Sequence, residues 1–273
     1  MVVGKSIYSE HILPSQMPSN ARFLGSDGHG NSLYIERTFE TVPVGALRFR
    51  ARVNTLDRYV LTEVISSDEY GVSLSPGDVV FDIGAHIGAF SVQAAKKAKQ
   101  VIAFEAEQGN YALLLENLSL NNCKNVEAFN AAVVGNDDKE RSLYVNVHRN
   151  TGSCSFFVKR NYYQTVQCTN IVGLLSKYKP SVIKIDSEGS EIEILDGLLH
   201  TDHSSVKKIV FEYHFQTKNN ARENYYRLIK LLKEEYDVSA LEKVGKQWHT
   251  IVKCQQKGIQ AKALVSSFSS THA

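Results

Sequence analysis

From Val79 onward, short apolar runs alternate with segments whose apolar residues follow helical spacing. Runs such as Val79-Val80-Phe81 have no polar face, which is typical of strands buried on both sides of a parallel sheet. Helices must provide that cover, so the alternation predicts an α/β domain with helices on both faces of one sheet. The expected strands are 79–82, 101–105, 126–131, 181–186 and 208–213, and the expected helices are 89–98, 111–120, 191–199 and 221–235.

The flanks of this alternation follow other patterns. Residues 1–56 hold short alternating runs between Gly/Ser/Asn/Asp clusters, which predicts a small β-rich appendage, and residues 56–70 have helical spacing. Less regular residues, 134–169, interrupt the alternation. Near the end, two strands in direct succession, around Val238 and at 249–253, predict an antiparallel hairpin that completes the sheet. We therefore expect an appendage at 1–56, the main domain at 57–254 and a flexible tail at 255–273.

The charge balance excludes some classes of partner. The chain has 31 Lys and Arg against 29 Asp and Glu, a formal net charge of +2. Proteins that bind phosphate backbones or anionic membranes usually carry a basic excess or stripe, so we expect neither nucleic acid nor membrane as a partner. The 4 scattered cysteines predict reduced thiols instead of a disulfide framework or a zinc motif. No apolar stretch has the length of a signal peptide core or a membrane span, which predicts a cytoplasmic protein.

The segment Asp82-Ile-Gly-Ala-His-Ile-Gly88 lies where the first expected parallel strand turns into its helix. Its glycines permit a tight turn and close approach of a backbone to a ligand. A dinucleotide fingerprint would read G-x-G-x-x-G, whereas here a carboxylate ends the strand and would repel a pyrophosphate. That carboxylate complements the ammonium group of S-adenosylmethionine, which carries no phosphate. We therefore expect this cofactor to be held by Asp82, Gly84, Ala85, His86 and Gly88.

Glu105 ends the second expected strand, 21 residues after Gly84. Doubly wound folds place an acidic residue at about this distance to accept hydrogen bonds from ribose hydroxyls. Taken alone, Glu105 is equally well explained as a charge that stabilises the start of a helix. Together with the Asp82 loop it favours a nucleoside cofactor, with Asn130 and Ala131 beside the adenine at the end of the third strand.

Two further strands end in charged residues. Ligands in open α/β sheets bind beyond the carboxyl ends of the strands, so Asp186, Glu188 and His214 should open into the same crevice. A charge on a core strand, such as that of Lys184, is costly unless it is paired or functional. Stabilisation of a helix start explains Glu191 well, but it explains less well why a strand should end in Lys-x-Asp-x-Glu.

The order DIGAHIGAFS, AFEAE, IKIDSEGSEIEIL and FEYH resembles the FkbM-type family of S-adenosylmethionine-dependent O-methyltransferases. The resemblance covers about residues 56–254. It implies a class I methyltransferase, Rossmann-like fold with a seven-stranded sheet whose last strand is antiparallel. It also implies methylation of a hydroxyl, often on a sugar or a glycosylated product, and hence a small-molecule or glycan acceptor. The family commonly has Asn where this chain has His86, near the methionine moiety, so a pH dependence of cofactor affinity is one expected consequence.

Methyl transfer to an alcohol is an in-line displacement that needs alignment of the reacting atoms and removal of the hydroxyl proton by a base or a metal. We expect Asp186 to be the base or a metal ligand, with Glu188 and His214 as partners or alternatives. Lys184 would orient the carboxylates. Asp186, Glu212 and His214 together form a candidate site for Mg²⁺ or Mn²⁺. Five acids, Asp82, Glu105, Asp186, Glu188 and Glu212, are expected to make one edge of the sheet locally acidic.

The acceptor and two other functions stay open at this point. Aromatic residues can pack against apolar sugar faces, although each aromatic residue alone is more simply explained as part of the core or its rim. One alternative function is a cofactor-binding module without catalysis, and another is a nucleotide-sugar or NAD-dependent dehydrogenase, against which the Asp82 loop argues. The aromatic candidates for sugar contact are Tyr162, Tyr163, Tyr213 and Trp248.

Overall fold

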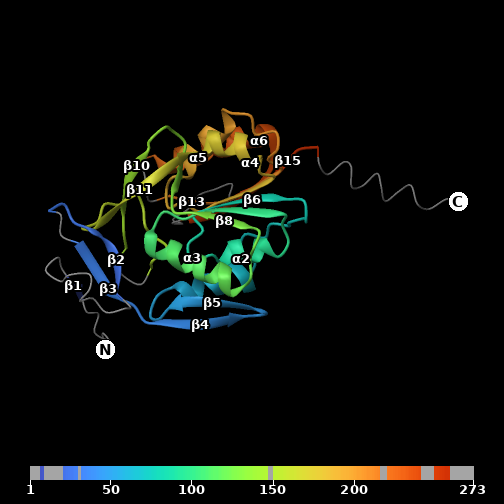
Figure 1. Ribbon diagram of the computed structural model, residues 1–273. Coiled ribbons are helices and arrows are strands. Elements are labelled where there is room, and N and C mark those ends of the chain that lie inside the picture. Colours follow the sequence, from blue (N-terminus) through green and yellow to red (C-terminus); the bar gives the residue numbers. More distant parts are fainter. Residues whose placement is uncertain are drawn as a thin grey trace.

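The centre of the molecule is a seven-stranded sheet in the order β14-β15-β13-β12-β6-β7-β8 (Figure 1). The computed structural model describes residues 7–8, 21–29, 32–146, 150–215, 220–240 and 249–258. Strand β15 runs antiparallel to both of its neighbours, whereas β13, β12, β6, β7 and β8 are parallel. This is the class I methyltransferase fold, as predicted. The strands are β6 (Val79–Ile83), β7 (Gln100–Phe104), β8 (Val126–Phe129), β12 (Val182–Ile185), β13 (Lys208–His214), β14 (Tyr236–Ser239) and β15 (His249–Gln256).

Helices cover both faces of this sheet, because alternate strand residues are apolar on both sides. Phe81 and Ile83 pack into one apolar cluster with α4, α5 and α6, whereas Val80 packs into a second cluster with α2 and α3. Figure 1 shows the two helix layers on opposite sides of the sheet. None of the helices in the described ranges has the length and apolar run needed to cross a bilayer. The helices are α2 (Ala89–Ala95), α3 (Gln108–Leu120), α4 (Ile171–Tyr178), α5 (Glu191–Leu199) and α6 (Ala221–Glu235).

Most expected elements are present, with shifts at their ends. Helices α5 and α6 have the predicted bounds, whereas α2 is shorter than predicted. Helix α3 begins earlier than predicted because the Glu107 side chain accepts hydrogen bonds from the backbone N–H groups of Gly109 and Asn110. The predicted strand 126–131 is divided: β8 ends at Phe129, and the chain then enters β9 (Ala132–Val134), which pairs with β11 in another sheet.

The N-terminal strands join the irregular insertion to form this second sheet, in the order β1-β3-β2-β11-β10. Strand β2 meets β11 through the pair Ser26 and Tyr163. Gly25 allows this close approach, because a Cβ on it would lie 2.6 Å from the carbonyl oxygen of Tyr163. The strands are β1 (Ile7–Tyr8), β2 (Ala21–Ser26), β3 (Ser32–Glu36), β10 (Glu140–Tyr144) and β11 (Tyr163–Asn170).

A hairpin of β4 (Phe39–Val44) and β5 (Leu47–Arg52) lies against α3. Asn117 of that helix and Asn121, its C-cap, dock the hairpin: each accepts a backbone N–H of β5 and donates to a backbone carbonyl of β5. The chain then forms α1 (Asp57–Leu61), which continues directly as the π-helix η2 (Thr62–Ser66).

The predicted helix within 56–70 is therefore confirmed, and the predicted boundary between residues 56 and 57 stays a prediction. Strand β15 continues to Gln256, past the predicted start of the tail, while residues 259–273 lie outside the described residues. All four cysteines are free thiols: Cys123, Cys154, Cys168 and Cys254.

Candidate functional site

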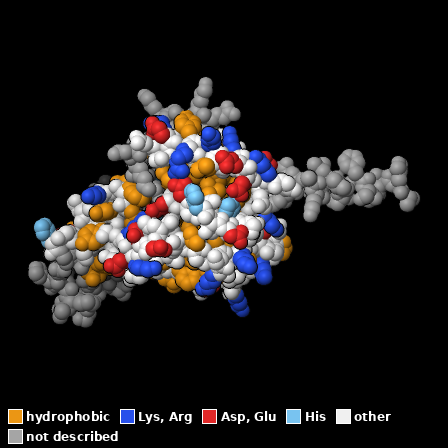
Figure 2. Space-filling view, turned by 90° about the horizontal axis from the view of Figure 1, so that it is seen from above, with side chains coloured by type: hydrophobic (Ala, Val, Ile, Leu, Met, Phe, Trp, Pro, Cys, Tyr) orange, Lys and Arg blue, Asp and Glu red, His pale blue; other side chains and the backbone are white. Residues whose placement is uncertain are grey.

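A cavity of about 200 Å³ opens at the carboxyl ends of β6, β12 and β13, and a smaller one of about 60 Å³ adjoins it. Figure 2 shows histidine and acidic side chains gathered near the middle of one face of the molecule. The two cavities form one crevice, because they share lining residues: Gly84, Glu105, Gly152, Asp186 and Glu188.

The loop after β6 makes the tight turn that its glycines predict. Gly84 and Gly88 have φ values of +75° and +90°, which favour glycine. A Cβ on Gly84 would lie 1.7 Å from the carbonyl oxygen of Asp186, and a Cβ on Gly88 would lie 2.7 Å from Leu114 Cδ1. The close contact that requires glycine at position 84 is therefore a contact within the protein, between the loops that follow β6 and β12.

Asp82 and Lys184 form a buried ion pair beneath this loop. The strand register places them side by side, and Asp82 Oδ1 lies 3.1 Å from Lys184 Nζ, without hydrogen-bond geometry. Asp82 Oδ2 accepts from Ser91 Oγ at 2.5 Å, and Lys184 donates to the carbonyl of Gly84 at 2.7 Å. Burial favours the neutral amine, but Asp82 and Asp186 outweigh it, so the pKa of Lys184 is raised. Asp82 is 0% exposed and lines neither part of the crevice, so its role toward a cofactor stays a prediction.

Glu105 lines both parts of the crevice. Its two carboxylate oxygens accept the backbone N–H groups of His86 and Glu107, each at 2.8 Å. Burial raises the pKa of Glu105 to about 7. A carboxylate oxygen can accept more than one hydrogen bond, so the group can hold the loop and still accept from a ligand hydroxyl.

The smaller part of the crevice is an apolar slot. Ala131 belongs to it, whereas the exposed Asn130 donates its amide to the carbonyls of Glu105 and Ala106 and lines neither cavity. Asn130 thus braces the loop that carries Glu105, and its predicted place beside a base stays a prediction. The apolar residues of the slot include Phe104, Ala131, Ala132, Leu143 and Phe156.

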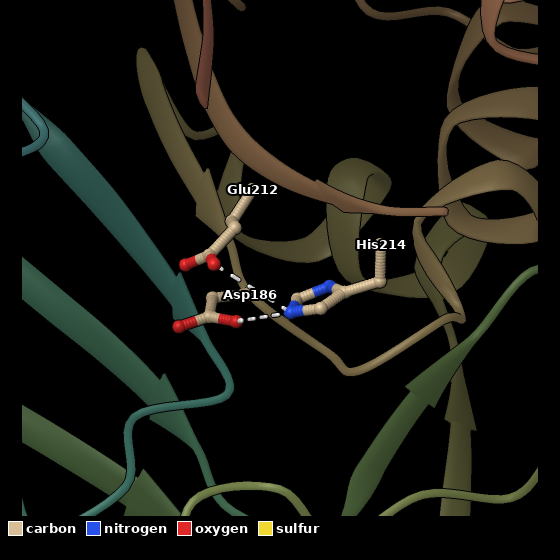
Figure 3. Close-up of side chains that lie close together, drawn as sticks. All are labelled: Asp186, Glu212 and His214. Atoms are coloured by element: carbon tan, nitrogen blue, oxygen red, sulfur yellow. Dashed lines mark ion pairs between the residues drawn. The ribbon is translucent and has the colours of Figure 1, made fainter. Parts of the chain in front are cut away.

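Asp186, Glu212 and His214 point toward one another at the wider end of the crevice (Figure 3). His214 Nε2 lies 4.0 Å from Asp186 Oδ1 and 3.6 Å from Glu212 Oε1. One donor atom from each residue lies within 4.8 Å of the others. The cause is topological: Glu212 and His214 are two residues apart on β13, and Asp186 follows the neighbouring strand β12. Two carboxylates and an imidazole are ligands that suit a divalent cation.

Glu191 fixes the orientation of His214. Its Oε1 lies 3.0 Å from His214 Nδ1 and also accepts from the backbone of Ser187 and Gly189. Burial lowers the pKa of His214, but Glu191 and Glu188 outweigh that effect, so the pKa lies well above its usual value. His214 therefore carries a positive charge at neutral pH, and a metal ion on Nε2 would displace that proton.

Glu188 stands beside this cluster, with Oε2 at 3.6 Å from His214 Nε2. Burial raises the pKa of Glu188 to about 7, against the opposing effect of His214. The residue has a φ of +48°, an uncommon conformation for a residue with a side chain, and it follows the strand end predicted to carry chemistry.

The sequence pattern did not identify the residues that α1, η2 and the following loop contribute to the crevice. Tyr70 donates to Asp186 Oδ2 at 3.0 Å. Burial and the nearby acids Glu212 and Glu63 raise the pKa of Glu69 to about 7. Helical spacing predicts a helix here, but which side of it meets the sheet edge is decided only by packing. The contributed residues are Leu56, Tyr59, Val60, Glu63, Val64, Glu69 and Tyr70, and His249 of β15 joins them.

Three of the four aromatic residues expected to contact a sugar lie away from the crevice. Tyr213 is buried and donates to the carbonyl of Ala221, and neither Tyr162 nor Tyr163 lines the crevice. Trp248 lies outside the described residues. Tyr59, which is 58% exposed, is the aromatic side chain that the crevice offers at its rim.

A sequence model of the methyltransferase FkbM domain matches residues 82–238, which is more than half of the chain. The chain belongs to the FkbM methyltransferase family. The match begins at Asp82 and ends within β14, so it contains the loops after β6, β7, β12 and β13. Membership favours methyl transfer over NAD-dependent dehydrogenation. The N-terminal strands, α1, η2 and β15 lie outside the matched FkbM region.

Individual relatives of this FkbM-family chain are distant. It is 26% identical over 199 residues to the AMB antimetabolite synthetase AmbE of Pseudomonas aeruginosa, covering 57% of this chain and 9% of that protein. It is 44% identical over 50 residues to the uncharacterized protein MJ1452 of Methanocaldococcus jannaschii, covering 18% and 19%. The chain thus spans less than a fifth of either relative. The crystal structure of methyltransferase FkbM from Methylobacillus flagellatus aligns with a TM-score of 0.46 and 16% identity, over 71% of this chain and 47% of that one.

Proposed function

We propose that this FkbM-family protein transfers a methyl group from S-adenosylmethionine to a hydroxyl of a sugar or sugar-bearing small molecule. One observation carries the proposal: Asp186 and Glu188 line the junction where the apolar slot meets the wider, acidic part of the crevice. A cofactor that extends from the slot and an acceptor in the wider part would meet at these two carboxylates. Ligands of doubly wound sheets bind at this edge, beyond the carboxyl ends of the strands.

The residues of the crevice fit the proposed cofactor. The apolar slot suits an adenine ring, and Glu105 can accept from ribose hydroxyls. When bound, S-adenosylmethionine supplies an electrophilic methyl group on a positively charged sulfur. That charge suits the carboxylates at the junction better than a pyrophosphate would. The acids that line the wider part are Glu63, Glu69, Glu105, Asp186, Glu188 and Glu212.

In this proposal the carboxylates remove the acceptor proton. Asp186 is held by Tyr70, which donates at 3.0 Å, and by the charge of Lys184 at 4.0 Å. Glu188, with its pKa of about 7, can take up and release a proton near neutral pH and acts as the partner or alternative base. Without a metal ion, His214 orients both carboxylates through its charge.

Asp186, Glu212 and His214 would hold Mg²⁺ or Mn²⁺ in this proposal. The geometry that favours it is the contact between His214 Nδ1 and Glu191, because ligating imidazoles usually bond a carboxylate through their second nitrogen. A divalent ion there would lower the pKa of the acceptor hydroxyl.

The test measures methyl transfer from labelled S-adenosylmethionine to free sugars, nucleotide sugars and glycosides, with amines, peptides and RNA as comparison acceptors. We expect transfer to hydroxyl acceptors only, and a loss of about 10²- to 10⁴-fold in turnover for Asp186→Asn, the usual effect of removing a general base. Binding of S-adenosylhomocysteine should survive that change. The matched control is Asp196→Asn, which alters an ion pair with Arg227, because neither residue lines the crevice.

Other outcomes would contradict particular parts of the proposal. Transfer to amines, peptides or RNA alone would exclude the sugar hydroxyl, and cofactor binding without any transfer would favour a binding module. Full activity of metal-free enzyme in EDTA would exclude the metal. We also keep the cytoplasmic location as a proposal, which the four free cysteines favour.

A further inference from the structure

His86 touches a buried network that begins outside the FkbM region. Its Nε2 lies 3.2 Å from Arg52 Nη2, at the end of β5. Arg52 in turn donates to both carboxylate oxygens of Asp57, at 2.8 and 3.0 Å. Thr151 Oγ1 donates to Asp57 at 3.0 Å and lies 3.3 Å from His86 Nε2. Two segments far from His86 in the sequence, residues 52–57 and the loop at Thr151, therefore surround one ring nitrogen.

The chemistry of Arg52 decides which nitrogen of His86 carries the proton. A guanidinium has N–H donors and no acceptor, so the nitrogen that faces it must accept. A charge-assisted bond from Arg52 outweighs the longer contact in which a neutral Nε2–H would donate to Thr151. Burial also lowers the pKa of His86 to about 4, so the ring is neutral at neutral pH. A neutral ring that accepts through Nε2 carries its proton on Nδ1.

The Nδ1 atom of His86 is the accessible one. The side chain of His86 is 14% exposed and lines the wider part. No described residue forms a hydrogen bond with Nδ1. A fully buried nitrogen without a partner would be an orphaned polar atom, and Nδ1 is not such an atom. It is therefore partly exposed, on a side chain that lines the cavity, whereas Nε2 contacts Arg52 and Thr151.

We propose that Arg52 is a positioning residue that fixes His86 as an Nδ1–H donor, and that this donor binds the carboxylate of S-adenosylmethionine. This inference rests on the proposed cofactor. Glu105 accepts the backbone N–H of His86, so a ribose on Glu105 places the next part of the cofactor beside His86. The cofactor carboxylate would be repelled by Asp186 and Glu188, and the His86 side of the cavity offers it a donor.

The tautomer is measurable in the unaltered protein. Nitrogen-15 labelling of histidine and long-range proton–nitrogen spectra distinguish Nδ1–H from Nε2–H rings, and His86→Asn assigns the signals by removing them. We expect an Nδ1–H ring whose Nδ1 signal moves when S-adenosylhomocysteine is added. An Nε2–H ring, or an Nδ1 signal that ignores the ligand, would overturn the proposal.

Calorimetry identifies the group that His86 binds. S-adenosylhomocysteine has the aminocarboxyl end, and 5′-methylthioadenosine lacks it. His86→Leu should weaken binding of S-adenosylhomocysteine about tenfold, the usual effect of losing one hydrogen bond to a charged group. It should leave binding of 5′-methylthioadenosine unchanged. His86→Asn keeps an N–H donor and should stay close to the unaltered protein. Equal weakening of both ligands, or of neither, would refute the assignment.

A double-mutant cycle separates positioning by Arg52 from a structural role. Arg52→Lys keeps a positive charge beside Asp57 but loses the guanidinium geometry. It should weaken binding of S-adenosylhomocysteine when residue 86 is histidine. In the His86→Asn background, where no tautomer needs fixing, it should leave that binding unchanged. Equal losses in both backgrounds, with melting curves showing folded variants, would make Arg52 merely structural. Failure of the unaltered protein to bind S-adenosylhomocysteine would instead refute the proposed cofactor.

Discussion

At the scale of single residues, the charged groups at the strand ends are satisfied mainly by one another. Asp82 is paired with Lys184, and His214 with Glu191. Each pair joins residues from different strands or from a strand and a helix, so the cost of burying one charge is offset only in the folded state. These ion pairs hold the side chains at the crevice in fixed orientations.

Lys184→Met should destabilise the protein by about 3–5 kcal/mol, because it leaves Asp82 buried and without its partner. Urea unfolding measures the loss. Lys184→Met combined with Asp82→Leu should recover much of that stability, since no unpaired charge remains. If the single and double variants unfold at the same urea concentration, the ion pair is not what stabilises this edge.

Glu105 should give the free energy of unfolding a pH dependence. Its pKa rises from the ordinary 4.5 to about 7 on folding, so the folded state binds more protons between these pH values. Its contribution to stability is therefore present below about pH 4.5 and is lost as the pH rises through about 7, by on the order of 3 kcal/mol.

Urea unfolding of Glu105→Gln at several pH values tests this. The glutamine side chain is neutral at every pH, so the free energy of unfolding of the variant should lack the decline caused by Glu105. The stability of the variant relative to the unaltered protein should therefore increase from pH 5 to pH 8. Parallel pH profiles of the two proteins would show that burial does not raise the pKa of Glu105.

At the scale of elements, the crevice depends on how closely the loops after β6 and β12 approach. Gly84 lies against the carbonyl of Asp186, and Lys184 donates to the carbonyl of Gly84. The same contacts place Asp186 opposite β13. The strand ends therefore determine the spacing of the candidate catalytic groups, because both loops begin on paired strands.

Gly84→Ala should destabilise the fold by several kcal/mol and abolish methyl transfer, since its Cβ would overlap the Asp186 carbonyl and the residue has a positive φ. Gly173→Ala is the matched control. Gly173 lies in α4 with open space around its Cβ position, so alanine there should stabilise the protein by up to about 1 kcal/mol. Thermal unfolding of both variants, with transfer assays, decides the matter. A stable, active Gly84→Ala protein would contradict the close approach.

At the scale of the whole molecule, a chain with a net charge of +2 carries a crevice whose charged lining residues are mainly acids. The field of such a crevice is local, because positive charges elsewhere balance it. S-adenosylmethionine carries one net positive charge and S-adenosylhomocysteine none.

Raising the salt concentration from about 0.05 to about 0.5 M should therefore weaken binding of S-adenosylmethionine several-fold more than binding of S-adenosylhomocysteine, since salt screens the attraction of the crevice for a cation. Calorimetry of both ligands at the two concentrations provides the measurement. An equal effect on the two ligands would show that the acids of the crevice do not contribute to cofactor binding.

Much of the fold could be predicted because its signals are local. Apolar runs that alternate with helical spacing require a covered parallel sheet, and a charged residue at the end of such a run must lie at the ligand-binding edge. Asp186, Glu188 and His214 were found in this way. Membership in the FkbM family and the seven-stranded sheet agree with that prediction.

The sequence by itself determined the order of the strands and helices and which residues stand at the carboxyl ends. Only the tertiary structure decided that Tyr70, Glu69 and the π-helix close over that edge, that Asp82 lies beneath the loop, and that Arg52 reaches His86. The physical reason is range. Periodicity and turn chemistry act over a few residues, whereas these contacts join distant segments and arise only when packing brings them together.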